Sequence, residues 1–286
     1  MESSPNNPGD KAHGASALPR IHAPAPLRAL AVIPARIGST RLPRKMLLEA
    51  GGLPLFAHTV RNVMGSGEPE GNATLARVVV ATDSEEIMAA AREHGIEALM
   101  TSADHRSGTD RVHEALGRLS TGGRPFDVVL NVQGDEPELP LEQINLLVSA
   151  FSDPEVQVAT LCAPVFHSAT LKDPAVVKVV RATNGNALYF SRSTIPSRTH
   201  AREDLGADAP LGWRHVGVYA FRPAALARFC ALPPGELEVL ESLEQLRWLE
   251  AGHSIRCLAV DHVSPGIDTQ VQFEAFRSSI EDVPEA

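Results

Sequence analysis

The sequence predicts an α/β fold, with a mostly parallel, Rossmann-like sheet flanked by helices and a small antiparallel β extension. In the first half of the chain, short apolar runs typical of buried strands alternate with helical segments, which is the pattern of β-α-β units. Beyond Cys162, strand-like runs are separated by Gly- and Asn-containing turns with no long helix between them. We therefore expect a single domain over residues 29–286, with the β extension inserted at about residues 164–222.

Residues 1–28 are predicted to form a disordered tail. They are rich in Pro, Ala, Ser, Asn and Gly and show no periodicity, so they cannot bury enough apolar surface to offset the entropy of ordering. They also lack the apolar core of a signal peptide. We expect the tail to be dispensable for any chemistry.

The first half of the chain supplies the parallel strands. A buried apolar run starts at Ala31 and is expected to break at Pro34. Pro54 suits the first turn of the helix that follows, and Asp83 is the expected cap of the next one. The remaining elements of this half are, in order, a helix over 53–64, a strand over 77–81, a helix through 94, and strands over 97–100 and 127–133.

The second half supplies the β extension and the closing helices. Its predicted strands cover residues 176–181, 187–191 and 213–221, and a polar, mobile loop is expected over 199–212. Helices follow over 223–231 and 240–251, then a strand over 254–260 and a last helix over 269–280.

Composition excludes several classes of protein. Lys+Arg 26 against Asp+Glu 35 gives a formal net charge of -9, which argues against a nucleic-acid binder. No apolar stretch is long enough to span a bilayer, so no membrane insertion is expected. Cys162, Cys230 and Cys257 lie far apart in no CxxC pattern, which indicates free thiols in a reducing cytoplasm and not a zinc site.

A cluster of positive charge stands out from this acidic background. The segment IPARIGSTRLPRK follows the first predicted strand, and Arg36, Arg41, Arg44 and Lys45 lie within it beside Gly38, Ser39 and Thr40. Small residues let backbone N–H groups approach an anion, and the cations neutralise it, so the loop suits a polyphosphate. It is neither a Walker A loop nor GxGxxG. The alternative is a surface loop whose basic residues are only solvated.

Two aspartates are candidate metal ligands. Asp135, in the segment NVQGDEP, follows the strand over 127–133, where it would face the same crevice as the basic loop. Asp268, in the segment PGIDT, precedes the last helix. Carboxylates suit a hard cation such as Mg²⁺ that bridges to phosphates. Both residues could instead be turn or helix caps, and capping does not exclude metal ligation.

Eight segments carry a resemblance to a known family. In order they are IPARIGSTRLPRK, ATDSEEI, SGTDR, NVQGDEP, ALYFSRSTIP, RHVGVY, LEQLRWLEAG and GIDT. From about Leu30 to Ile280 the sequence resembles the 3-deoxy-manno-octulosonate cytidylyltransferases, the CMP-Kdo synthetases of Gram-negative bacteria. The resemblance implies a nucleotide-diphospho-sugar transferase fold, usually a homodimer with Mg²⁺. It implies the reaction of CTP with Kdo to give CMP-Kdo and pyrophosphate, for lipopolysaccharide synthesis.

The resemblance also implies roles for individual residues. The CTP phosphates would be held by Arg36, Ser39, Arg41 and Lys45, and the cytidine would lie near Ser107, Gly108, Thr109 and Arg111. The sugar would meet Gln133, Arg192, His215, Tyr219, Glu244 and Gln245. The metals would be held by Asp135 and Asp268, which join Arg36, Arg41 and Lys45 as the catalytic set. Arg44 departs from the family pattern, in which a small residue is expected between the Pro and the Lys of the loop.

Each of these roles has a structural alternative. His215 and Tyr219 could lie on a solvated sheet face, and Glu244 and Gln245 on the surface of a helix. The segment from Ser107 could simply cap a helix. For Arg192 a functional role is favoured, because it lies among apolar residues where an unpaired charge is costly. For the whole chain, the alternatives are a cytidylyltransferase for another acidic sugar, of the sialic-acid type, and a nucleotide-binding regulator without turnover.

Overall fold

A single curved sheet organises the part of the chain that the computed structural model describes, namely residues 27–39, 41–65, 75–121, 123–200, 209–264 and 266–281. Residues 1–26 of the predicted tail, 201–208 of the predicted mobile loop, and Thr40 and Pro265 of the candidate site segments lie outside the described residues.

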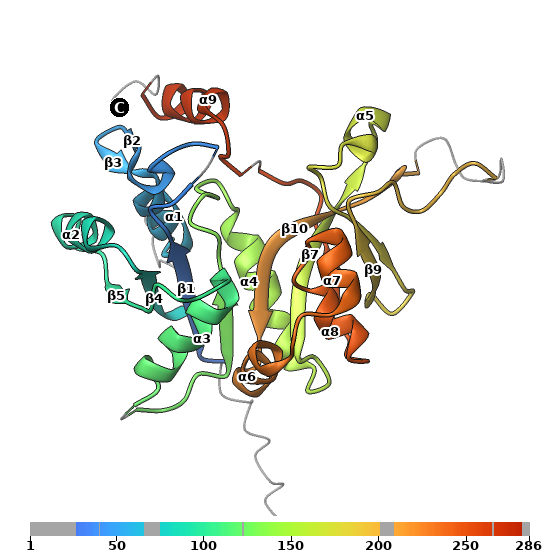
Figure 1. Cartoon of the computed structure of the whole chain (residues 1–286), viewed down its shortest axis with the longest axis horizontal. Helices are drawn as coiled ribbons and strands as arrows, with labels where there is room; N and C mark the ends of the chain where they lie inside the picture. Colours follow the sequence, from blue (N-terminus) through green and yellow to red (C-terminus); the bar gives the residue numbers. More distant parts are fainter. Residues whose placement is uncertain are drawn as a thin grey trace, which may run out of the picture.

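The main sheet is mixed and mostly parallel, as predicted. Its strand order is β11-β7-β10-β6-β1-β4-β5, and β10 runs antiparallel to its neighbours β6 and β7, whereas β1 is parallel to both β4 and β6 (Figure 1). The strands are β1 Ala29–Ala35, β4 Leu75–Thr82, β5 Ala98–Met100, β6 Val128–Asn131, β7 Val158–Val165, β10 Gly212–Phe221 and β11 Arg256–Ala259. The sequence pattern does not predict β7.

The antiparallel strands predicted beyond Cys162 are present. β8 (Lys178–Arg181) pairs with both β9 (Ala187–Ser191) and β10, and all of these pairings are antiparallel. A five-residue helix, α5 (Ser168–Lys172), connects β7 to this group. β10 begins beside β8 and continues into the main sheet, where it pairs with β6. β10 therefore joins β8 and β9 to the part of the sheet that carries the site described below.

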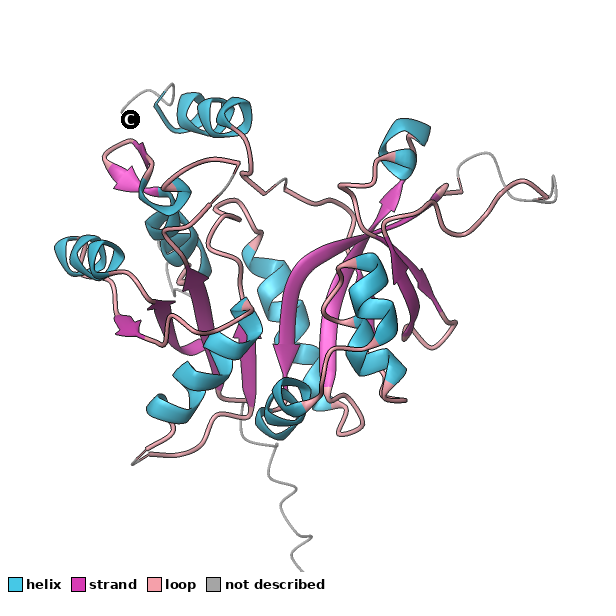
Figure 2. Cartoon of the chain, viewed as in Figure 1, coloured by secondary structure: helices cyan, strands magenta, loops and turns pink. Residues whose placement is uncertain are grey.

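Helices cover both faces of the sheet (Figure 2). Buried residues of α1, α2 and α4 pack with one face, around Ile33 and Leu130, and those of α3, α6 and α8 pack with the other, around Val32 and Phe221. The helices are α1 Leu55–Val63, α2 Glu85–Glu93, α3 Gly108–Leu119, α4 Leu141–Ser149, α6 Pro223–Ala231, α7 Glu236–Glu241, α8 Leu246–Glu250 and α9 Gln270–Glu281.

The C-terminal helix α9 packs on the short hairpin of β2 (Glu49–Ala50) and β3 (Leu53–Pro54), next to the basic loop (Figure 1). Phe273 and Phe276 of α9 share a separate apolar cluster with Leu42 and Ile267. This packing brings the chain around residue 268 to the loop at residues 36–45, although more than two hundred residues separate them.

Two predicted boundaries are wrong. β1 does not break at Pro34 but continues to Ala35. Its pairing with β6 ends at Val32, so β6 offers no partner for a backbone N–H at position 34. Proline, which lacks that N–H, therefore loses no hydrogen bond there. The helix predicted over 240–251 is two short helices, α7 and α8, since Ser242 adopts a left-handed conformation (φ 52°) that interrupts it.

The described residues contain no helix that is both long and apolar enough to cross a membrane. All three cysteines are free, as predicted, with Cys162 and Cys257 buried in neighbouring strands β7 and β11.

Candidate active site

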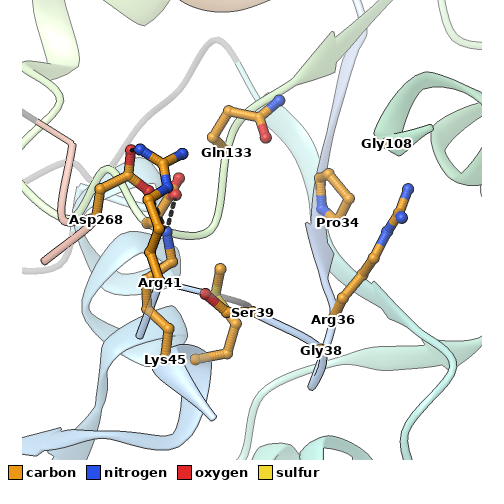
Figure 3. Close-up of a pocket in the computed structure, with 11 residues that line it drawn as sticks. Pro34, Arg36, Gly38, Ser39, Arg41, Lys45, Gly108, Gln133 and Asp268 are labelled. Atoms are coloured by element: carbon orange, nitrogen blue, oxygen red, sulfur yellow. Dashed lines mark hydrogen bonds and ion pairs between the residues drawn. The ribbon is translucent and has the colours of Figure 1, made fainter. Parts of the chain in front are cut away.

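A pocket lies at the carboxyl ends of β1 and β6, where the basic loop meets the segment after β6 and the segment before α9 (Figure 3). Arg36, Ser39, Arg41 and Lys45 all line it, as the sequence predicts. The complete lining is Pro34, Arg36, Gly38, Ser39, Arg41, Lys45, Met46, Gly108, Gln133, Asp135 and Asp268. Residues from four distant parts of the chain therefore meet at one edge of the sheet.

Lys45 joins the two predicted metal ligands. Its Nζ lies 2.5 Å from Oδ2 of Asp135 and 2.8 Å from Oδ1 of Asp268, and the lysine itself is only 6% exposed. Burial by itself would lower the pKa of Lys45, but the charges and hydrogen bonds of Asp135 and Asp268 outweigh it and raise that pKa. Lys45 is therefore a permanent cation between two carboxylates.

Asp268 is free to bind cations because another residue caps α9. Thr269 Oγ1 accepts from the Gln272 N–H at 3.3 Å, and Gln272 Oε1 accepts from the Thr269 N–H at 2.9 Å, which is a capping box. The second oxygen of Asp268 pairs with Arg41 at 3.1 Å. The alternative that Asp268 is the N-cap is therefore wrong.

Asp135 is held by backbone contacts on both sides. Thr59 Oγ1 donates to the Gly134 carbonyl at 2.9 Å, and the Ile267 N–H donates to the Asp135 carbonyl at 2.9 Å. The second bond ties the segment of Asp135 directly to that of Asp268. A β-carbon at Gly134 would lie 3.2 Å from the Pro34 carbonyl, so glycine lets this segment approach β1 closely.

The donor set suits a divalent cation only in part. Asp135 and Asp268 offer carboxylate oxygens, but no group of three or more His, Cys, Asp or Glu side chains able to hold a metal occurs among the described residues. Mg²⁺ commonly takes one or two protein carboxylates and completes its shell with substrate phosphates and water. The pair therefore fits a cation that arrives with a polyphosphate, and Lys45 bridges the pair in this structure.

The amino end of α3 closes the pocket on the side opposite Asp268. Ser107 caps α3 through a capping box with Asp110, and Gly108 lines the pocket. A β-carbon at Gly108 would lie 3.3 Å from the Pro34 ring, so the helix end fits tightly against β1. The capping alternative for Ser107 is thus confirmed, and the same cap places Gly108 at the pocket.

The structure does not bring Arg111 to the pocket. Its side chain is fully buried, and its guanidinium pairs with Asp83 at 3.0 Å and donates to Thr101. Arg111 therefore does not line this pocket, and its place near the cytidine stays a prediction. Asp83 was expected to cap α2, and that expectation is wrong, because Ser84 accepts from the Ile87 N–H and is the cap.

A chain of polar side chains leads from the pocket toward the second half of the molecule. Gln133 donates to Asn131 at 3.3 Å, Asn131 donates to Thr109 at 3.3 Å, and Thr109 donates to Glu244 Oε2 at 2.8 Å. Burial raises the pKa of Glu244, and its Oε1 is buried without a hydrogen-bond partner in the described residues. Gln245, next to it, is 7% exposed. Glu244 and Gln245 therefore do not lie on a helix surface.

Tyr219 and His215 continue this chain on β10. Tyr219 pairs with Asn131 in the sheet register, and its ring centroid lies 5.3 Å from that of His215. His215 Nε2 forms a hydrogen bond of 2.9 Å with Thr160. Burial, aided by the charge of Arg214, lowers the pKa of His215 to about 3, so its ring is neutral. His215 and Tyr219 therefore do not lie on a solvated face of the sheet, which was the alternative for both residues.

The hydroxyl of Tyr219 is an unfilled polar group. It is buried near Thr160 but forms no hydrogen bond of normal geometry with the described residues, and burial raises the pKa of Tyr219 well above its usual value. Buried polar groups normally find a partner in proteins. Glu244 likewise keeps one buried oxygen without a hydrogen bond to the described residues.

Arg192 lies apart from the pocket lining and holds backbone. Its Nε donates to the Glu241 carbonyl at 3.0 Å and its Nη1 to the Pro174 carbonyl at 3.2 Å, while its own N–H donates to Glu241 Oε2 at 2.9 Å. Arg192 therefore anchors the end of α7, just before the segment that carries Glu244. The sequence predicts a role for Arg192 but does not identify these partners.

Asn131 and Thr160 are polar residues of this region that the sequence interpretation missed. Asn131 ends β6 and lies two residues before Gln133, in the run predicted as a strand over 127–133, so the period of two could have identified it. Thr160 lies in β7, the strand that was not predicted, and nothing local in the sequence indicates its contact with His215.

Comparison with known proteins agrees with the resemblance. A family model described as Cytidylyltransferase matches residues 30–255. A 3-deoxy-manno-octulosonate cytidylyltransferase from Rhodopseudomonas palustris (strain HaA2) is 44% identical over 254 residues, covering 87% of this chain and 96% of that protein. Another, from Acidobacterium capsulatum, is 44% identical over 250 residues, covering 87% of this chain and 95% of that protein.

Solved structures give the same picture. The structure of a CMP:2-keto-3-deoxy-manno-octonic acid synthetase complexed with CTP aligns with a TM-score of 0.79 at 38% identity, covering 89% of this chain and 99% of that chain. A cytidylyltransferase from Leptospira borgpetersenii aligns with a TM-score of 0.57 at 15% identity, covering 91% of this chain and 89% of that chain, and shows a shared fold alone.

Proposed function

Since the chain belongs to the cytidylyltransferase family, and within it to the 3-deoxy-manno-octulosonate cytidylyltransferases, we propose that it transfers the cytidylyl group of CTP to Kdo. The products are CMP-Kdo, a sugar nucleotide for lipopolysaccharide synthesis, and pyrophosphate. The observation that carries this proposal is the position of Lys45 between Asp135 and Asp268, in a pocket that Arg36 and Arg41 also line. This arrangement suits a polyphosphate, because cations surround a place where carboxylates can share a metal.

The phosphate side of the site consists of Arg36, Ser39, Arg41, Lys45, Asp135 and Asp268. Arg36, Arg41 and Lys45 neutralise the charge that accumulates on the leaving pyrophosphate. Asp268 holds both Arg41 and Lys45 at the pocket, which keeps two cations beside the place of the phosphates. Gly108, at the amino end of α3, lines the same pocket, which supports its predicted place near the cytidine.

The sugar side consists of Gln133, His215, Tyr219, Glu244 and Gln245. The unfilled hydroxyl of Tyr219 and the free Oε1 of Glu244 bind sugar hydroxyl groups. The neutral ring of His215 is a hydrogen-bond partner that carries no charge. Arg192 holds the segment of Glu244 in position.

The reaction joins the two sides. The anomeric hydroxyl of the sugar attacks the α-phosphorus of CTP in line, and pyrophosphate leaves on the opposite side. Asp135 and Asp268 would hold Mg²⁺, which when bound lowers the pKa of the attacking hydroxyl and neutralises phosphate charge. Lys45 bridges these two carboxylates and lines the same pocket as Arg36 and Arg41, so its charge lies close to the phosphates.

A panel of acidic sugars with each of the four nucleoside triphosphates tests this function. Pyrophosphate release with CTP and Kdo, and not with sialic acid, is the expected result. Pyrophosphate release with sialic acid in place of Kdo would favour a cytidylyltransferase of the sialic-acid type. CTP binding without pyrophosphate release would favour a nucleotide-binding regulator. A homodimer in the cytoplasm is part of the proposal, and sedimentation velocity checks the dimer.

A further inference from the structure

Arg44 has an unusual backbone conformation for its residue type. Its φ of 56° and ψ of 26° lie in the left-handed region, and among the described non-glycine residues only Ser242 also has a positive φ. A β-carbon disfavours this region, whereas glycine enters it freely. Contacts with the rest of the protein must therefore offset the cost of this conformation.

The side chain of Arg44 supplies that restraint. Its Nη1 lies 3.1 Å from Oε1 of Glu86 and its Nη2 lies 2.5 Å from Oε2, so the pair is bidentate. Glu86 lies in the first turn of α2, where the helix dipole favours a carboxylate. The hydrogen bond between them, and then their charges, raise the pKa of Arg44 and lower that of Glu86. The pair is thus intact near neutral pH.

The conformation at Arg44 determines where Lys45 points. The Arg44 carbonyl accepts from the Leu47 N–H at 2.8 Å and begins the short 3-10 helix Lys45–Leu47. Lys45 is the first residue of that turn, and its ammonium reaches both Asp135 and Asp268. A different φ at Arg44 would send the lysine away from them.

We propose that the ion pair of Arg44 with Glu86 holds the phosphate loop in the left-handed turn that aims Lys45 at the two aspartates. Arg44 is then a positioning residue for CTP, an inference that rests on the proposed function. Without the pair, Arg44 adopts the commoner right-handed or extended conformations, and fewer molecules have a loop ready for CTP. The apparent affinity for CTP falls in proportion to the fraction of molecules whose loop is ready, whereas saturating CTP draws all molecules into the ready conformation. The KM for CTP should therefore change and kcat should not.

The first experiment compares Glu86→Gln with a matched control. Glu86→Gln should raise the KM for CTP about three- to fivefold, a size typical of exposed ion pairs, with kcat and the KM for the sugar unchanged. The control is Glu97→Gln, which removes the similar exposed pair of Arg77 with Glu97, 39% and 44% exposed, away from the phosphate loop. This control should leave the KM for CTP unchanged.

The second experiment repeats Glu86→Gln in an Arg44→Gly background. Glycine needs no restraint in the left-handed region, so Glu86→Gln should then have no further effect. An equal rise in KM in both backgrounds would overturn the proposal. So would a rise with Arg44→Gly alone that exceeds the rise with Glu86→Gln, because Arg44 would then contact CTP itself.

Hydrogen exchange gives a readout that does not depend on turnover. Amides of residues 42–48 should exchange faster in Glu86→Gln than in the parent, and the difference should disappear in the Arg44→Gly background. Unchanged exchange would refute the role of Arg44. A parent protein that releases no pyrophosphate would refute the proposed function instead, so the two failures are distinguishable.

Discussion

The phosphate side and the sugar side of the candidate site differ in how completely their polar groups are satisfied. On the phosphate side, Lys45 pairs with both Asp135 and Asp268, and Asp268 also pairs with Arg41. On the sugar side, the Tyr219 hydroxyl and one oxygen of Glu244 are buried with no partner in the described residues. The first region is charged and its charges are paired, whereas the second keeps buried polar atoms without a partner.

This difference indicates what each region contributes. A preorganised set of charges stabilises a transition state because it needs no rearrangement during reaction, so its loss should lower kcat. Unfilled buried donors and acceptors gain partners only when a ligand arrives, so their loss should weaken binding of that ligand. Substitutions on the two sides should therefore separate into effects on rate and effects on affinity.

The largest expected effect is that of Asp135→Asn on the phosphate side. It removes a proposed metal ligand and one of the two partners of the buried Lys45, so kcat should fall roughly a thousandfold. Pyrophosphate release at saturating Mg²⁺ measures it. The control is Glu138→Gln, an exposed carboxylate of the same segment. A parent-like rate would show that Asp135 holds no essential metal.

Lys45→Ala should have the next largest effect. Loss of one preorganised cation costs about 3 kcal/mol of transition-state stabilisation, which is about a hundredfold in kcat. Initial rates of pyrophosphate release give kcat, with Lys172→Ala as a control at an exposed lysine. If only the KM for CTP changed, Lys45 would stabilise bound CTP and the transition state of the reaction equally, and the predicted effect on kcat would be wrong.

Tyr219→Phe tests the sugar side with an intermediate effect. Removing the hydroxyl should raise the KM for the sugar about tenfold and leave the KM for CTP unchanged, because one ligand hydrogen bond is lost. Thermal stability should not fall, since the lost hydroxyl has no protein partner in the described residues. A lower melting temperature with unchanged KM would mean that the hydroxyl is structural.

The smallest effect is the contribution of His215 to pH dependence. Its pKa of about 3 in the folded protein lies below the usual 6.5, so below pH 6.5 the unfolded chain binds more protons and stability falls as pH falls toward 3. In His215→Asn, the loss of unfolding free energy between pH 7 and pH 6 should be roughly 0.7 kcal/mol smaller than in the parent. Urea denaturation at both pH values measures it, and equal losses would contradict a buried neutral His215.

Much of the phosphate side could be predicted from the sequence, because its residues follow strand ends. Asp135 comes directly after β6 and the basic loop directly after β1, and parallel strands present their carboxyl ends at one edge. Local chemistry was ambiguous for Asp268, which could cap α9 or bind cations. The capping box of Thr269 with Gln272 resolves this, and it requires the side-chain geometry.

The sequence by itself determined the order of most strands and helices and the residues of the basic loop, since apolar periodicity and charge are local properties. Only the tertiary structure decided the neighbours of Arg111, Arg192 and Glu244, which touch Asp83, Glu241 and Thr109. The Thr109–Glu244 bond joins residues 135 positions apart. Which side chains meet over such separations depends on how the sheet and its helices pack, and no local pattern records it.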